Sequence, residues 1–200
     1  MKFSTPLRYP GGKGKLTDYF KTMFVENDLI GGDYAEPYAG GAGIGINLLL
    51  GEYASKLYLN DLNRSVYAFW RTLLDQTDEL CALVSDTEVS IQEWHRQKKI
   101  QSDESASPLE LGFSTFFLNR TNRSGIIIAG VIGGKDQTGP WKLDARFNKI
   151  DLLARIEVIA RNKDRISLSN LDAIEFLKCE VPTMSKKSLV YLDPPYYVKG

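Results

Sequence analysis

A carboxylate, two prolines and two aromatic rings stand together near the end of the chain, in the sequence Asp193-Pro194-Pro195-Tyr196-Tyr197. An amine on a flat ring carries two N–H donors and offers an aromatic face. Asp193 and the carbonyl of Pro194 could accept the two N–H groups, and Tyr196 could stack on the ring. These residues indicate chemistry at a ring amine, although an Asp-Pro-Pro turn is also a common way for a chain to leave a strand.

A second group of such residues begins with Glu36, directly before a stretch that contains glycines 40, 41, 43 and 45. The spacing is not that of the dinucleotide-binding motif, and no lysine or serine follows to hold a phosphate. Asp61 lies 25 residues beyond Glu36, at the end of the next predicted strand, where an acid can accept from ribose hydroxyls. A glycine turn with two strand-end acids favours a nucleoside that carries a cation, such as S-adenosylmethionine, over a purely structural turn.

Two further motifs leave more than one interpretation open. The turn Pro10-Gly11-Gly12-Lys13 precedes a predicted helix and could hold an anion, but it lacks the full phosphate-loop pattern and could be a plain turn. Asp172 follows a predicted strand at residues 165–169. It could accept from the adenine amine of a cofactor, or it could be an acid favoured at a helix N-terminus by the helix dipole.

The apolar pattern predicts the elements that position these residues. Strands are expected to end at or near the acids, and the strand at 189–192 is expected to be buried on both faces because its apolar run is continuous. In an open α/β sheet, ligands bind at the carboxyl ends of such strands. The predicted strands cover residues 34–36, 56–60, 165–169 and 189–192, and the predicted helices include 16–24, 46–50, 65–74, 108–118 and 148–161.

The region between the second and third predicted strands has its own pattern. Ser90 and Ser107 each precede a glutamate by three residues, which is the capping-box signature of a helix start. The segment 119–125 is expected to break the helix before it, and the β-type run 126–132 could be one arm of a hairpin whose tip, 133–141, could equally be a mobile loop. In the helix at 148–161, one face is expected to be apolar through Ile150, Leu153, Ile156 and Ile159.

The composition excludes several classes of function. The 200 residues carry 25 basic and 25 acidic side chains, so no global charge indicates a nucleic-acid or membrane partner. Residues 119–149 nevertheless hold six basic and two acidic side chains, which fits phosphate contact on one face but is also common on solvated surfaces. Cys81 and Cys179 are expected to be reduced core thiols, and with the single His95 they predict no metal site. The absence of a leader or a membrane-length apolar run predicts a cytoplasmic protein.

The order of the motifs is Tyr-Pro-Gly-Gly-Lys, then Glu-Pro-Tyr-Ala-Gly-Gly-Ala-Gly, an inserted basic segment, and Asp-Pro-Pro-Tyr. This order closely resembles the alpha group of adenine-N6 DNA methyltransferases, the Dam-like family, over nearly the whole chain. The resemblance implies an α/β, Rossmann-like S-adenosylmethionine-dependent methyltransferase sheet with an inserted, mainly helical target-recognition subdomain. The expected boundaries are 1–74 for the first part of the catalytic domain, 75–147 for the insertion and 148–200 for the remainder.

The resemblance and the motifs together give three groups of candidate site residues, and no metal ligand. The candidate catalytic residues are Asp193, Pro194, Pro195 and Tyr196. The candidate cofactor-binding residues are Tyr9, Lys13, Glu36, Pro37, Tyr38, Gly40, Gly43, Asp61, Asp172 and Asp193. The candidate DNA-binding residues are Asn119, Arg120, Arg123, Lys135 and Arg146.

The activity implied by the resemblance is methyl transfer from S-adenosylmethionine to the N6 amine of an adenine flipped out of double-stranded DNA. A cognate restriction endonuclease is a candidate partner. Family members continue beyond the Asp-Pro-Pro-Tyr motif, whereas this chain ends four residues past Tyr196, so we expect the C-terminal strands to be absent. An incomplete sheet edge could also lead to self-association. The alternative functions are an inactive, truncated DNA- or cofactor-binding remnant of the family, and methyl transfer to cytosine-N4 or to RNA.

Overall fold

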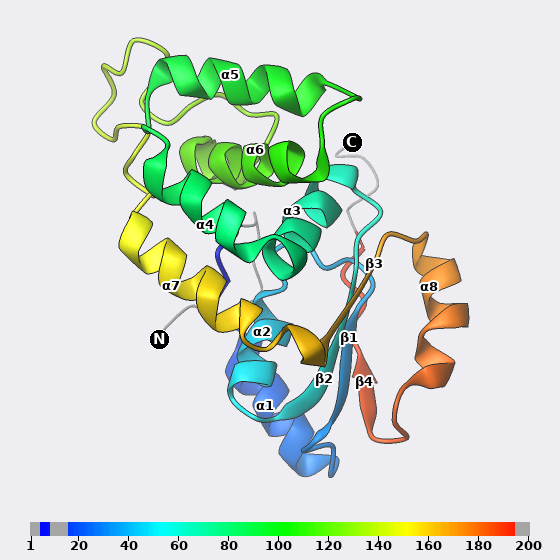
Figure 1. Cartoon of the computed structure of the whole chain (residues 1–200). Coiled ribbons are helices and arrows are strands. Elements are labelled where there is room, and N and C mark those ends of the chain that lie inside the picture. Colours follow the sequence, from blue (N-terminus) through cyan, green and yellow to red (C-terminus); the bar gives the residue numbers. More distant parts are fainter. Residues whose placement is uncertain (1–4, 9–15, 195–200) are drawn as a thin grey trace, which may run out of the picture. The chain divides into compact units, whose positions relative to one another are not determined.

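The computed structural model describes residues 5–8 and 16–194, which contain eight α-helices and four strands (Figure 1). Their packing separates two compact units. The first is an α/β unit made of described residues 16–67 and 162–194, and the second is a helical unit made of residues 5–8 and 68–161. Tyr9, Lys13, Pro195 and Tyr196 lie outside the described residues, so their predicted roles stay predictions. Within the described ranges, no helix is both long enough and apolar enough to cross a membrane.

The α/β unit is built on a parallel sheet. Its strands are β1 (Gly32–Glu36), β2 (Ala54–Asn60), β3 (Ile166–Ser169) and β4 (Ser188–Val190), in the spatial order β3-β2-β1-β4. All three strand pairs are parallel. The α/β class with a parallel sheet, and all four predicted strands, are therefore confirmed to within a few residues at their ends.

Helices cover both faces of this sheet, with α1 (Thr17–Glu26) and α2 (Gly43–Leu50) on one face and α8 (Ala173–Cys179) on the other (Figure 1). Successive side chains of a strand point to opposite faces. Tyr34 in β1 accordingly packs against Phe20 and Phe24 of α1, whereas Ala35 packs with Phe176 of α8. Both faces of β1 are therefore buried, and its last residue, Glu36, is placed within this core.

The last strand differs from the prediction. Residues 189–192 were expected to be buried on both faces, but β4 is only half-buried and Leu192 is exposed. Among the described strands β4 pairs with β1 alone, and beyond Val190 the amide of Tyr191 donates to the carbonyl of Ala35. A strand at the margin of a sheet has one neighbour instead of two, which leaves more of its surface open.

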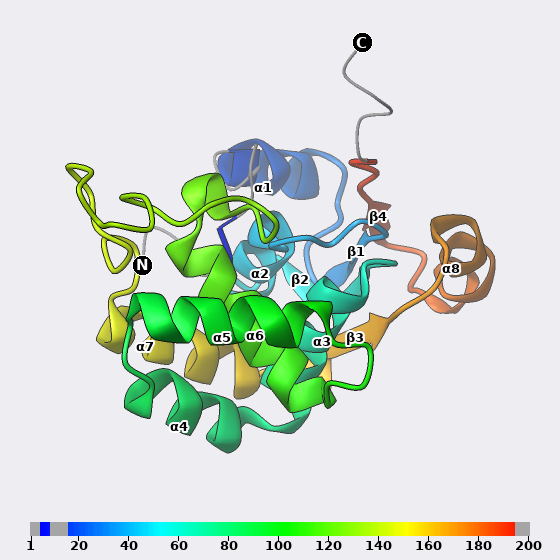
Figure 2. The ribbon, with the colours of Figure 1, turned by 90° about the horizontal axis from the view of Figure 1, so that it is seen from above.

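The helical unit contains the second part of α3 (Arg64–Asp75), then α4 (Thr77–Asp86), α5 (Ile91–Ser102), α6 (Pro108–Thr121) and α7 (Lys149–Ala160). α5 and α6 pack side by side (Figures 1 and 2). The core between its helices contains the rings of Phe69, Phe116, Phe117 and Phe147. Ser107 and Glu110 form the predicted capping box, and Ser90 caps α5 through the amide of Glu93. The packing groups α7 with this unit, whereas the sequence predicted the insertion to end at residue 147.

Four local predictions are wrong. The helix expected to end at 118 continues to Thr121, because Asn119 and Arg120 find buried partners. The run 126–132 is not a strand, and its only described ladder contact is one antiparallel bridge between Asn122 and Val131. On α7, Ile156 and Ile159 are buried as predicted, but Ile150 is 84% exposed and Leu152 completes the buried face instead. Cys179 is exposed rather than in the core.

Candidate active site

Carboxylates gather where the parallel strands of the α/β unit end. Glu36 is the last residue of β1, Asp61 directly follows β2, Asp172 lies three residues beyond β3, and Asp193 lies three residues beyond β4. Because all four strands run in the same direction, these positions lie along one edge of the sheet. This is the edge at which open α/β sheets bind ligands.

Glu36 is buried at this edge, with 6% of its surface exposed. Its Oε1 accepts the amide of Gly45 in the first turn of α2, 2.9 Å away, where a helix favours negative charge. Burial raises the pKa of Glu36 to about 7, the hydrogen bond from the amide of Gly45 offsets part of that rise, and the charge of Asp193 adds to it. A cation beside Glu36 would therefore stabilise a carboxylate that is costly to ionise.

Gly45 lets α2 come this close to the sheet. A Cβ atom at this position would lie 2.6 Å from Cδ1 of Leu57 and 3.1 Å from Oε1 of Glu36. Any side chain here would push the helix away from the buried carboxylate. The sequence drew attention to the glycines as a ligand-binding turn, and the structure adds a packing reason for this one.

The end of β2 holds the glycine turn in place. Asp61 accepts the amide of Gly40 through Oδ2 at 2.8 Å and the amide of Asn63 through Oδ1 at 2.9 Å. The amide of Ala39 donates to the carbonyl of Asn60. Burial raises the pKa of Asp61 above its usual range, and the two amides counteract that rise. The acid predicted to accept from ribose therefore also shapes the turn.

Asn60 is a functional candidate that sequence reasoning missed. Its fully buried side chain donates to the carbonyls of Pro37 and Leu171, and it accepts from the amide of Leu171 and the hydroxyl of Ser169. One amide group thus connects the loops that follow β1 and β3 across the end of β2. The available signal was an asparagine that ends an apolar strand directly before Asp61.

Asp193 comes close to Glu36, and Asp172 has another local role. Asp193 is half-buried and its charge raises the pKa values of both Glu36 and Tyr34, so the loops after β1 and β4 face a common region. Asp172 is exposed and its Oδ1 accepts the amide of Ile174, 2.9 Å away, as the N-cap of α8. The helix-cap interpretation of Asp172 is confirmed, and its contact with a cofactor stays a prediction.

The remaining predicted residues of this edge lie in or beside the glycine turn. Pro37 and Gly40 are buried, Tyr38 is half-buried, and Gly43 is the first residue of α2. Gly40 and Ala42 both have positive φ angles, 47° and 46°, which bend the chain sharply between β1 and α2. Pro194 is exposed beyond β4.

A family model for D12 class N6 adenine-specific DNA methyltransferases matches residues 9–199. The chain belongs to this family. None of the curated proteins compared with it matches. Membership identifies the protein as an adenine-specific DNA methyltransferase and confirms the resemblance found in its motifs. The parallel α/β unit of this methyltransferase is consistent with such an enzyme.

Two of the candidate DNA-binding residues of the methyltransferase are buried within the helical unit. Asn119 is 3% exposed and donates to the carbonyls of Arg8 and Gly125, while its Oδ1 accepts the amide of Arg8 at 2.7 Å. Arg120 is 7% exposed and donates to the carbonyl of Pro6 through Nε and Nη2. Both side chains therefore fix the N-terminal segment 5–8 against α6.

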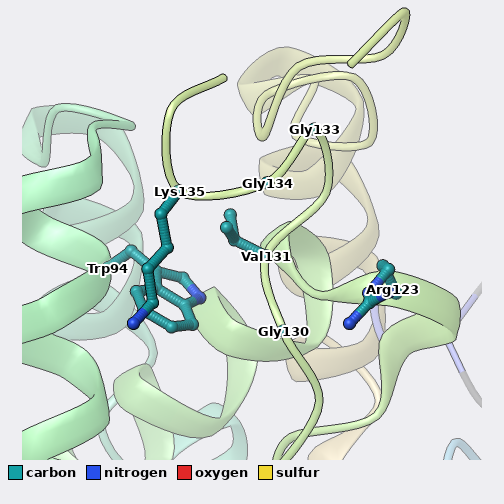
Figure 3. Close-up of a pocket in the computed structure, with 7 residues that line it drawn as sticks. All are labelled: Trp94, Arg123, Gly130, Val131, Gly133, Gly134 and Lys135. Carbon is teal, nitrogen blue, oxygen red and sulfur yellow. The ribbon is translucent and has the colours of Figure 1, made fainter. Parts of the chain in front are cut away.

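The other candidate DNA-binding residues, Arg123, Lys135 and Arg146, are exposed. Arg123 and Lys135 line a cavity of about 300 Å³ together with Trp94, Val131 and three glycines, Gly130, Gly133 and Gly134 (Figure 3). In this view Lys135 runs beside the Trp94 ring, and Arg123 lies on the other side of the glycine segment. A cavity with an aromatic wall and two cations suits a nucleic-acid group.

Asn122 fixes the shape of the loop around this cavity. Its Oδ1 accepts Nε1 of Trp94 at 2.6 Å, and its Nδ2 donates to the carbonyls of Ile126 and Ile127. These bonds satisfy backbone groups that a strand would have paired in a ladder. They account for the turn at residues that the sequence predicted to be a strand.

Proposed function

We propose that this methyltransferase transfers a methyl group from S-adenosylmethionine to the N6 amine of an adenine that is flipped out of double-stranded DNA. The observation that carries the proposal is the placement of Glu36 and Asp193 after adjacent parallel strands: Glu36 ends β1, Asp193 lies three residues beyond β4, and the charge of Asp193 raises the pKa of Glu36. One acid belongs to the glycine-turn motif and the other to the Asp-Pro-Pro-Tyr motif. Their proximity supports a shared site for cofactor and target base.

The residues of the β1 and β2 ends fit S-adenosylmethionine. When bound, the cofactor supplies an electrophilic methyl group on a sulfonium. Glu36 would place negative charge beside the cationic methionine part, and Asp61 has further acceptor positions for ribose hydroxyls. Pro37, Tyr38, Gly40 and Gly43 would form the wall of this part of the site. Tyr9, Lys13 and Asp172 stay predicted cofactor contacts.

The residues after β4 would receive the target base. Asp193 and the carbonyl of Pro194 accept the two N–H groups of the adenine amine, which draws the nitrogen lone pair out of conjugation with the ring. The lone pair would then be directed at the methyl group. As the N–C bond formed, the C–S bond would break and leave its electron pair on sulfur as the neutral thioether S-adenosylhomocysteine, and the amine would release one proton to Asp193 or to water. Transfer would be direct, dominated by positioning and electrostatics. Flipping the base costs a few kcal/mol of unstacking, which stacking on Tyr196 would partly offset. Pro195 would stiffen this segment.

The helical unit is proposed as the target-recognition subdomain. Arg123, Lys135 and Arg146 expose positive charge in a segment with six basic and two acidic residues, which suits contact with phosphates. Asn119 and Arg120 would support DNA binding indirectly, because their buried side chains hold the backbone of residues 5–8. A cognate restriction endonuclease and self-association through a sheet edge stay predictions.

The test is transfer of labelled methyl from S-adenosylmethionine to mixed-sequence DNA, followed by nucleoside analysis. We expect N6-methyladenine as the product. N4-methylcytosine as the product would contradict the assignment of the base, and the same assay with RNA as the only substrate would contradict the assignment of the nucleic acid if RNA alone were labelled. Calorimetry with S-adenosylmethionine completes the test: binding without transfer would identify an inactive remnant, and no binding would contradict the cofactor site.

A further inference from the structure

Arginine side chains gather around the N-terminal segment Thr5–Arg8 of the helical unit. Arg120 donates to the carbonyl of Pro6 through two of its nitrogens. Arg155 donates through Nη1 to the carbonyl of Thr5, 3.1 Å away. The backbone of Arg8 is held by Asn119, which leaves the Arg8 side chain out of that contact. Backbone carbonyls of this segment thus help to orient the guanidinium groups of Arg120 and Arg155.

The positive charge of this cluster exceeds its negative charge. Asp151 forms an ion pair with Nη2 of Arg155 at 2.7 Å and is the acid that also acts on Arg120. Burial, together with repulsion from Arg155 and Arg8, lowers the pKa of Arg120 to about 9. Burial and repulsion from Arg146 lower the pKa of Arg8 in the same way. Like charges held together away from water cost free energy unless a counter-charge is present.

Two buried donor atoms of the cluster also lack an acceptor. Nη1 of Arg8 and Nε of Arg155 have no hydrogen-bond partner among the described residues. A buried donor that is left unpaired costs on the order of 1–3 kcal/mol. A tetrahedral oxyanion supplies hydrogen-bond acceptors and negative charge, and guanidinium groups bind phosphate oxygens with good geometry.

We propose that Arg8, Arg120 and Arg155 form a binding site for a phosphate group, and that in the enzyme's substrate this group is one phosphate of the DNA backbone. The assignment of this phosphate to DNA rests on the proposed function, whereas the phosphate-binding site itself does not. Arg8 is half-buried and would meet the phosphate first. Arg120 is buried and would form the base of the site.

The first experiment measures the melting temperature of the whole chain in inorganic phosphate and in chloride at equal ionic strength. Arg8→Gln removes the charge but keeps the backbone contacts with Asn119. Arg161→Gln removes the same charge from a side chain of this unit that is 74% exposed. Phosphate is expected to raise the melting temperature of the wild type and of Arg161→Gln, but not of Arg8→Gln. Equal responses of all three proteins, or no response, would overturn the site.

The second experiment measures DNA affinity against salt concentration for the same three proteins. Loss of one phosphate contact reduces the slope of log K against log salt by about one. When the salt concentration rises from about 50 to about 200 mM, the DNA affinity of the wild type should then fall about threefold further than that of Arg8→Gln. A phosphate response with an unchanged slope would identify a free anion and overturn the DNA source. Methyl transfer by the same wild-type preparation separates the two proposals, because absent transfer with an intact phosphate response contradicts only the proposed function.

Discussion

The two units each bury polar side chains, but the partners of those side chains differ. Glu36 in the α/β unit accepts an amide from α2 and lies near a second acid, Asp193. Asn119 and Arg120 in the helical unit bind backbone groups of residues 5–8. The first arrangement concentrates negative charge at a ligand-binding edge, and the second ties a distant segment to a helix. The hydrogen-bond partners of the buried polar side chains, rather than the residue types, therefore distinguish a ligand-binding site from a structural anchor.

The largest effect is expected from Asp193→Ala. Removal of the proposed acceptor of the adenine amine should lower the rate of methyl transfer by about a thousandfold, within the range found for positioned acid–base groups. The affinity for S-adenosylmethionine, measured by calorimetry, should be largely retained, because Glu36 and Asp61 remain. Glu175→Ala, at an exposed position of α8, is the control. Full turnover by Asp193→Ala would show that Asp193 has no catalytic role.

The second prediction concerns the structural anchor. Asn119→Ala removes three hydrogen bonds with Arg8 and Gly125 and leaves buried backbone groups unpaired, which should lower the free energy of unfolding by about 2–4 kcal/mol. Asn27→Ala, which removes one exposed bond to Met23, should cost at most about 0.5 kcal/mol. Denaturant unfolding measures both.

The same variant also tests whether Asn119 is a structural anchor or a DNA contact. If Asn119→Ala kept its stability but lost DNA affinity, Asn119 would contact DNA directly, as its sequence position first suggested. The structural anchor would then have to be assigned to Arg120 alone.

The third prediction concerns the pH dependence of Glu36. Its pKa in the folded protein is about 7, above the ordinary value of 4.5, so folding favours the protonated form. The stability contributed by this group is fully present below pH 4.5 and is lost as the pH rises through about 7. Relative to Glu36→Gln, the wild type should therefore lose up to about 3 kcal/mol of unfolding free energy over this window.

Glu36→Gln also tests whether Glu36 contacts the cofactor. If Glu36 holds the cationic part of S-adenosylmethionine, the affinity of the wild type should fall as the pH drops below about 7, where the carboxylate takes up a proton. The affinity of Glu36→Gln should be lower and should not follow this titration. Calorimetry across the pH range measures both proteins. Parallel pH profiles would mean that Glu36 supports α2 without contacting the cofactor.

Local sequence patterns predicted much of the α/β unit. Each strand is a short apolar run that ends near an acid. In the helical unit, both capping serines were readable from the residues that follow them. The predictions were wrong where a polar side chain, rather than a neighbouring strand, forms the hydrogen bonds of the backbone. Asn122 satisfies the carbonyls of Ile126 and Ile127, so an apolar run that favours a strand becomes a turn. The continuous run that ends at Leu192 predicted a strand, but its periodicity could not indicate that β4 has a single described neighbour.

The sequence by itself determined the family, the parallel α/β class and the acids at the strand ends, because motifs and apolar runs are properties of neighbouring residues. Only the tertiary structure decided which polar side chains are buried and what they bind. Arg120 lies in a basic segment, yet its acceptor is the carbonyl of Pro6, 114 residues away in the chain. Such a partner is brought close by folding, and no local pattern encodes it.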